Sequence, residues 1–270
     1  MNDNIIKEIS INLNLKENFV LNVLKMLEEG NTIPFIARYR KEATGNMDEE
    51  QIKQIGEVYN YEVNLLKRKE DVIRILEEKE LITDELRNKI MEAKKLVEVE
   101  DLYRPYKEKK KTKATDAINN GLEPLAKQIL AFPLTGSLEE LSKKYINDKV
   151  KTVEEAITGA KYIIAEWVSD NAYYRKWIRN FIYNNGLIIS KKKKDADDEN
   201  KIYEMYYEYN EPVKYAKSHR ILAMNRGEKE KVLNVSIKVD DEKIISFLES
   251  KMLLKRIVYK AKWFYKFTMN

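Results

Sequence analysis

The amino-acid sequence predicts a mainly α-helical protein with a helix-turn-helix-like N-terminal unit, a long antiparallel helix hairpin and a helical body that contains a small β element. Glycine and proline are scarce, at 8 and 5 of 270 residues, which favours long helices joined by short connections. Hydrophobic residues make up 43% of the chain, enough for a substantial core. We expect four segments: the N-terminal unit at 1–47, the hairpin at 48–100, the body at 101–250 and a basic aromatic tail at 251–270.

The first segment has the pattern of three short helices. Apolar residues recur at spacings of mostly four across residues 5–27, and Gly30 with the following Asn is a typical helix stop. Pro34 fits the first turn of a third helix. Three residues of that helix are expected to pack inward: Phe35, Ile36 and Tyr39. Three short helices in about 45 residues are the outline of a helix-turn-helix unit.

The second segment is expected to form a long helix at 49–79 and a shorter one after it. Asp48 and Gln51 have the spacing of a capping box. Apolar residues recur every seven positions in two columns, which are Ile52, Tyr59, Leu66 and Ile73, and Val58, Leu65 and Val72. Two such columns predict a seam for partner helices. Thr83 can cap the second helix, whose apolar positions are Leu86, Ile90, Ala93 and Val97.

The third segment begins with a stretch, DLYRPYKEKKKTKAT at 101–115, that we expect to be extended, because Pro105 disfavours a helical conformation at Arg104. Further helices are expected near 122–131, 138–146, 153–168 and 170–184. Ser137 and Thr152 each precede a Glu at capping-box spacing. Strands are expected at 187–189 and, more clearly, at 232–239, with the lysines at 191–194 in a loop.

The residues that usually carry catalysis or bind metal ions are scarce in this chain. Cysteine is absent, which excludes disulfides and thiolate metal sites. The single histidine, His219, has no nucleophile or carboxylate at a recognisable spacing. We therefore expect no enzymatic activity, no cofactor, no metal site and no small-molecule substrate. No apolar run reaches about 18 residues and the N-terminus is polar, so we expect no membrane span and a cytoplasmic location.

The net charge of +5 does not by itself predict a nucleic-acid-binding surface. The tail at 251–270 carries six basic residues and no acid, so residues 1–250 sum to −1 (+5 minus +6). Any basic surface in the body must therefore come from local clusters. Two clusters are candidates for binding nucleic acid. They are Arg38, Arg40 and Lys41, and the lysines Lys107, Lys109, Lys110, Lys111 and Lys113.

Each candidate cluster has two interpretations. The cations can contact phosphates, or they can form solvated faces that pair with nearby acids such as Glu42. The first cluster has few Asn, Gln or Ser side chains nearby, which argues against reading of base edges. A dense group of tyrosines leaves a similar choice between base stacking and packing against helices. Its members are Tyr203, Tyr206, Tyr207, Tyr209 and Tyr215.

Three motifs resemble, in order and spacing, the Tex family of bacterial transcription accessory proteins. They are TIPFIARYRKEATG at 32–45, DLYRPYKEKKKTKAT with GLEPLA at 101–126, and SHRILAMNRGEKEKVL at 218–233. The resemblance covers residues 1–245 and implies a function linked to transcription. Members continue with an RNase-H-like domain, a helix-hairpin-helix segment and an OB-fold to which RNA contacts are chiefly attributed. The 251–270 tail does not resemble that continuation, so we expect a truncated or frameshifted end, disordered or aberrant.

The resemblance and the residues together lead to two functional hypotheses. The first is the helical N-terminal scaffold of a Tex-like transcription accessory protein, which binds DNA or RNA weakly, without sequence preference and without catalysis. The alternative is a protein-interaction scaffold that docks RNA polymerase or the ribosome without touching nucleic acid.

Overall fold

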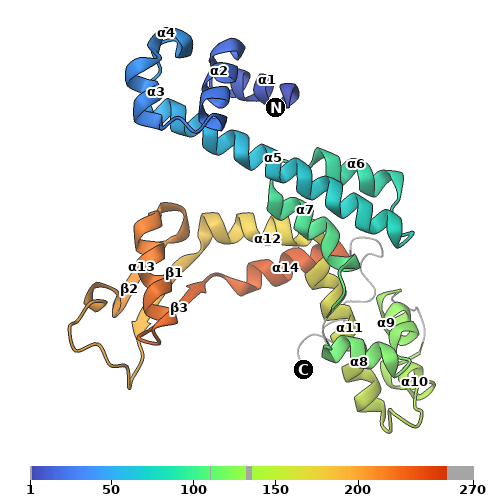
Figure 1. Ribbon diagram of the computed structural model, residues 1–270. Coiled ribbons are helices and arrows are strands. Elements are labelled where there is room, and N and C mark those ends of the chain that lie inside the picture. The colour runs from blue at the N-terminus through green and yellow to red at the C-terminus, as the bar shows by residue number, and fades with distance from the viewer. Residues whose placement is uncertain (1, 110, 132–135, 254–270) are drawn as a thin grey trace. The chain divides into compact units, whose positions relative to one another are not determined.

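The computed structural model describes residues 2–109, 111–131 and 136–253, and the chain divides into two compact units, Met1–Tyr106 and Lys107–Asn270. Figure 1 shows that helices dominate both units and that strands occur only in the second, within the described residues. The predicted fold class, mainly α with a small β element, is confirmed. No helix in these described ranges is long and apolar enough to cross a membrane.

The first unit consists of helices throughout. They are α1 (Asp3–Asn12), α2 (Glu17–Glu28), α3 (Ile33–Tyr39), α4 (Lys41–Thr44), α5 (Glu49–Glu78), α6 (Asp84–Glu92), α7 (Leu96–Tyr103) and the 3₁₀ turn η1 (Arg104–Tyr106). Side-chain caps fix where several of them begin. The Oγ1 atom of Thr32 accepts the backbone N–H of Phe35, and Asp48 with Gln51 forms the predicted capping box of α5.

One hydrophobic core joins the first three helices to the N-terminal half of α5. Its fully buried side chains include Ile9, Val20, Val23, Ile36, Ile52 and Ile55. Gly45 ends α4 with φ of 67°, and a Cβ atom there would lie 2.5 Å from Cε2 of Phe19. A residue without a side chain is therefore needed where α4 meets α2. This close approach lets the end of α4 pack against α2.

A second core lies between the C-terminal half of α5 and the two helices that follow. Figure 1 shows α6 running back along α5, as the predicted hairpin requires. Leu65, Val72, Leu76, Ile90 and Val99 are buried there. The second helix is shorter than predicted, because Ala93 leaves the helical conformation with ψ of 130°. Val97, expected at its end, belongs to α7 instead.

The prediction of an extended segment at 101–115 is wrong. Helix α7 continues to Tyr103, Arg104 keeps helical angles (φ −51°, ψ −43°), and Pro105 lies in η1. The steric preference that Pro105 imposes on Arg104 is modest. Burial of Val99 and Tyr103 in the second core outweighs it. The same stretch also begins a helix at Lys113.

The second unit begins with a helical bundle and continues into the β element. Its elements are α8 (Lys113–Asn119), α9 (Glu123–Leu130), α10 (Leu138–Lys143), α11 (Val153–Asp170), α12 (Ala172–Asn185), β1 (Leu187–Lys192), η2 (Glu204–Tyr206), β2 (Glu208–Pro212), η3 (Val213–Tyr215), α13 (Ser218–Lys229), β3 (Leu233–Lys238) and α14 (Asp241–Leu253). The four predicted helices of this unit are confirmed. Helices α8, α13 and α14 and strand β2 were not predicted.

Helix α11 is the centre of the bundle. Its small residues Ala156, Gly159 and Ala160 let α8 and α9 approach closely, and a Cβ atom on Gly159 would lie 2.3 Å from Cδ1 of Leu122. The capping box predicted at Ser137 is confirmed. At Thr152 only half of it forms, because Oγ1 accepts from the N–H of Glu155 while the Glu155 carboxylate accepts from the N–H of Lys151.

The β element is an antiparallel sheet with the order β2-β1-β3. Helix α13 packs against β3, and Ile188, Met224 and Leu233 form the small core between them. The strand predicted at 232–239 is confirmed as β3. The lysines at 191–194 were expected in a loop, but the first two extend β1, where ladder pairing to β2 and β3 holds them. In the 251–270 tail, only residues 251–253 are described, and they end α14.

Candidate nucleic-acid interface

The first predicted cluster lies at the junction of α3 and α4. Arg38, Arg40 and Lys41 are all exposed, and Arg40 is the residue between the two helices. The Cζ atom of Arg40 lies 5.4 Å from the centroid of the Phe35 ring. Arg38 and Lys41 have no ion pair with any described residue. The structure therefore places three cations on one short exposed stretch.

The aromatic side chains of α3 do not pack inward as a group. Ile36 is fully buried, as predicted, but Phe35 is 36% exposed and Tyr39 is 68% exposed. Phe35 and Tyr39 are four positions apart and therefore share a face of the helix, away from the side that Ile36 buries. Their ring centroids are 5.3 Å apart. The prediction that Tyr39 packs inward is therefore wrong. We call Phe35, Arg38, Tyr39, Arg40 and Lys41 the α3 surface.

The second predicted cluster contains one lysine that is held inside its own unit. The Nζ atom of Lys109 lies 3.2 Å from Oε2 of Glu166 and forms a second ion pair with Asp170. The Lys109 side chain is only 26% exposed, and that of Asp170 only 7%. A paired, half-buried ammonium group is less available to a phosphate than a solvated one.

The other described lysines of the cluster have surroundings that differ from those of Lys109. Lys107 is exposed, and Lys111 is 83% exposed with its Nζ atom 3.7 Å from Asp116. The Nζ atom of Lys113 lies 4.9 Å from the centroid of the Tyr162 ring. Lys110 lies outside the described residues. The cluster is therefore a set of cations in different environments, not a uniform basic patch.

The tyrosine group mainly serves the packing of the β element. Tyr203 and Tyr206 are buried, although Tyr215 is 64% exposed. The Tyr207 hydroxyl donates to the Asp198 carboxylate at 2.7 Å, and this bond, with burial, raises the pKa of Tyr207 to about 12. The hydroxyl of Tyr203 likewise donates to Glu230 at 2.7 Å, and burial first, then that bond, raises the pKa of Tyr203. Packing is thus the better interpretation for the buried members.

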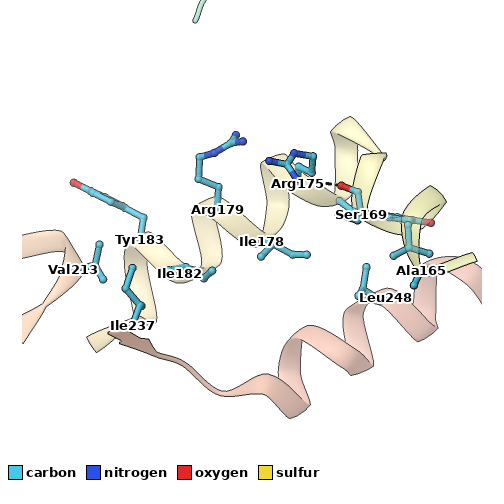
Figure 2. A pocket seen from close by; sticks show the side chains of 12 residues that line it. Ala165, Ser169, Arg175, Ile178, Arg179, Ile182, Tyr183, Val213, Ile237 and Leu248 are labelled. Carbon is cyan, nitrogen blue, oxygen red and sulfur yellow. Dashed lines mark hydrogen bonds between the residues drawn. The ribbon is translucent and has the colours of Figure 1, made fainter. Parts of the chain in front are cut away.

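An apolar groove in the second unit was not predicted from the sequence. Figure 2 shows Ile178 and Ile182 of α12 facing Leu248 of α14 across it. Its volume is about 720 Å³. Arg175 donates to the Ser169 carbonyl at 3.2 Å, and Trp177 stacks on Phe247 with centroids 3.6 Å apart. Although α12 is rich in aromatic residues, none of its residues is fully buried. The aromatic composition of α12 was the sequence signal that could have indicated the groove. The other wall is formed by α14, which was not predicted.

The arrangement defines a class of protein. It is a mainly helical protein with a small antiparallel sheet and with exposed cations and aromatic rings on α3, and its described part has no group of three or more His, Asp or Glu side chains placed to hold a metal ion.

Comparison with known proteins identifies the family. Residues 3–77 match the Tex-like protein N-terminal domain, and residues 135–263 match the Tex central region. The chain belongs to the Tex family. The resemblance that the three motifs indicated is thereby confirmed. The second match extends to residue 263, so it reaches further into the 251–270 tail than the motifs indicated.

Similar proteins occur in bacteria and in animals. The chain is 51% identical over 253 residues to "Uncharacterized protein YdcI" of Bacillus subtilis, covering 93% of this chain and 35% of that protein. It is 36% identical over 235 residues to "Transcriptional accessory protein Tex" of Neisseria gonorrhoeae, covering 86% and 31%. It is 29% identical over 252 residues to "S1 RNA-binding domain-containing protein 1" of Homo sapiens, covering 89% and 25%. The chain spans about a third of the length of the bacterial relatives.

Proposed function

We propose that this chain is the N-terminal scaffold of a Tex-type transcription accessory protein and that it binds nucleic acid weakly and without sequence preference. The observation that carries the proposal is the α3 surface, where Arg38, Arg40 and Lys41 are exposed together. The names of the relatives support the context, since one is a transcriptional accessory protein and another contains an S1 RNA-binding domain.

Phosphate contact is the chemistry that these cations favour. Each phosphate that a cation neutralises on duplex DNA adds about 0.9 to the slope of log affinity against log salt. The exposed face of α3 has no Asn, Gln or Ser, the side chains that read base edges together with Arg. We therefore infer contact with the backbone and no sequence specificity. The exposed lysines Lys107, Lys111 and Lys113 add a second, weaker contribution, and Lys109 contributes least because Glu166 and Asp170 already pair with it.

Salt-dependent binding of the full chain tests this proposal. Fluorescence anisotropy with labelled 20-nucleotide RNA and DNA, at salt concentrations from 50 to 200 mM, should show affinity that falls as salt rises. Replacing Arg38, Arg40 and Lys41 with Gln should lower the salt slope by about 2 to 3. A matched control replaces three exposed lysines elsewhere, Lys143, Lys144 and Lys151, and should change the slope much less. If the unaltered chain binds neither polymer at 50 mM salt, the proposal fails.

The alternative function is a protein-interaction scaffold, and the apolar groove between α12 and α14 favours it. Helical surfaces with unfilled apolar grooves are common docking sites for partner proteins. RNA polymerase and the ribosome are the partners to test as purified assemblies. Binding that persists after Lys107, Lys111 and Lys113 are replaced with Gln, in a chain that shows no affinity for nucleic acid, would favour this alternative.

We further infer that the chain does no bond chemistry, needs no cofactor and works in the cytoplasm. The scarcity of catalytic side chains and the absence of cysteine support this inference. A nuclease assay with RNA and DNA substrates and added Mg²⁺ tests the first part, and turnover that exceeds a purified blank would refute it.

A further inference from the structure

The α3 surface combines exposed aromatic rings with exposed cations. Tyr39 is 68% exposed, and its ring lies 5.3 Å from that of Phe35 at an interplanar angle of 41°. The Arg40 guanidinium covers Phe35 from another side, with Cζ 5.4 Å from the ring centroid. The Tyr39 hydroxyl has no hydrogen bond to any described residue. The ring of Tyr39 is thus held by a neighbouring ring and remains open to solvent.

Burial does not explain why these rings are present. Ile36 supplies the core contact of α3 and is fully buried, while Tyr39 contributes little to the core on the opposite face. Large exposed aromatic side chains beside basic residues are characteristic of surfaces that bind single-stranded nucleic acids, since every base has a π-face that stacks on such a ring.

We propose that the α3 surface binds an unpaired base of a single-stranded nucleic acid, which stacks on Tyr39 while Arg38, Arg40 and Lys41 contact the adjacent phosphates. This inference rests on the proposed nucleic-acid function and adds to it the kind of polymer, single-stranded in preference to duplex. A base that is already stacked within a duplex cannot offer its face to Tyr39, whereas an unpaired base can.

The dimensions of α3 also argue against a duplex. At 1.5 Å per residue its seven residues span about 10 Å, and its exposed side carries aromatic rings but no Asn or Gln to read base edges beside Arg38. A major-groove helix reads base edges with such polar side chains. Phe35 supports the Tyr39 ring, and Arg40 can add cation–π attraction to a base that stacks beside it.

The test compares ring loss with ring retention at Tyr39 in the full chain. The probes are 12-nucleotide oligo(U) and oligo(dT), each with one 2-aminopurine, and a 12-base-pair duplex of the same length. Tyr39→Leu should weaken binding to both single strands at least about fivefold, whereas Tyr39→Phe should keep it. The salt slope should stay the same in both variants, because no cation is lost. Binding to the duplex should change less than twofold.

Two further measurements separate stacking from other effects. Stacking on Tyr39 should quench the 2-aminopurine fluorescence on binding, and Tyr39→Leu should abolish that quenching. Tyr215→Leu is the matched control, since Tyr215 is 64% exposed and lies far along the chain in the second unit, and it should change neither quantity. The RNA and DNA arms show which sugar the site accepts.

The outcomes distinguish this inference from the function on which it rests. If the unaltered chain binds no nucleic acid at 50 mM salt, the proposed function fails. If the chain binds and Tyr39→Leu binds the single strands as tightly as the unaltered protein does, stacking on Tyr39 is refuted while the phosphate contacts stand. Tighter binding to the duplex than to either single strand would also refute it.

Discussion

Lys109 Nζ lies 3.2 Å from Glu166 Oε2, and this ion pair fastens the lysine-rich stretch after η1 to helix α11. Asp170, one turn further along α11, pairs with the same ammonium group. The same ammonium group therefore pairs with two carboxylates whose side chains are 18% and 7% exposed. In a cluster that looks uniform in the sequence, Lys109 is paired and largely buried, whereas Lys111 is 83% exposed.

Loss of the Lys109 charge should destabilise the second unit. In Lys109→Gln the two partly buried carboxylates would lose the ammonium group that pairs with both of them, and we expect the free energy of unfolding to fall by about 1–3 kcal/mol. Lys111→Gln removes the same charge from a side chain that is 83% exposed, and should cost less than about 0.5 kcal/mol. Urea denaturation of both variants gives the comparison. Equal losses would contradict a special role for Lys109.

Gly45 should tolerate no side chain. Gly45→Ala meets the Phe19 ring at 2.5 Å in a left-handed conformation, so we expect a loss of about 3 kcal/mol from strain and clash together. Gly30→Ala has the same kind of conformation, with φ of 86° and no heavy atom within 4 Å of the added Cβ. It should cost only about 1 kcal/mol. Thermal unfolding followed by circular dichroism would separate the two, and a milder effect at Gly45 than at Gly30 would disprove the clash.

Ser190 and Ser142 should respond in opposite directions to the same substitution. The Ser190 hydroxyl is buried on the inner face of β1 without a hydrogen-bond partner among the described residues, whereas that of Ser142 donates to the Leu138 carbonyl at 2.7 Å. Ser190→Ala should leave stability unchanged or raise it by up to about 1 kcal/mol. Ser142→Ala should lower it by about 1 kcal/mol. A clear loss of stability in Ser190→Ala would show that its hydroxyl is satisfied after all.

Tyr207 should make the β element lose stability as the pH becomes alkaline. Its pKa is about 12 in the folded protein against 10.0 for the free side chain, because its hydroxyl donates to Asp198. The folded state therefore keeps a proton that the unfolded state loses above pH 10, and the stabilisation falls as pH rises from 10 to 12. Tyr207→Phe should be less stable than the unaltered protein below pH 10, and the difference should shrink across that window.

The measurement for Tyr207 is urea denaturation at several pH values from 8 to 12. Tyr203 and Tyr209 also have a raised pKa, mainly through burial, so the unaltered protein and Tyr207→Phe should both lose stability as pH rises above 10. The informative quantity is the difference between variant and parent. Tyr215→Phe is the control, and a pH-independent difference at Tyr207 would contradict the assignment.

Local signals in the sequence were sufficient to predict the long helices. The capping box of Asp48 and Gln51 and the repeated apolar columns located α5 to within one residue of its observed end, because both signals act within one helix. The prediction from Pro105 was wrong for the opposite reason. Its steric effect is local, but the burial of Tyr103 that outweighs it depends on residues of α5 far along the chain.

The sequence indicated candidate residues for the site but not their surroundings. The positions of Arg38 and Arg40 follow directly from the sequence, and both are exposed as expected of phosphate-binding cations. The outward position of Tyr39 and the pairing of Lys109 with Glu166 depend on which faces the tertiary packing covers. Helix α14 lacks a strong apolar period, and without it the groove over Ile182 could not be anticipated.

Strand β1 is the middle strand of the sheet but the first of the three strands in the chain. The ribosome makes the middle strand first, and residues 187–192 must wait with both edges unpaired until 208–212 and then 233–238 have emerged. We expect those delayed, non-local pairings to form slowly, so that an unpaired strand that carries Leu187, Ile188 and Ile189 is open to mispairing in the interval. The lysines that end this strand, at 191 and 192, are well placed to keep nascent chains apart until the sheet closes.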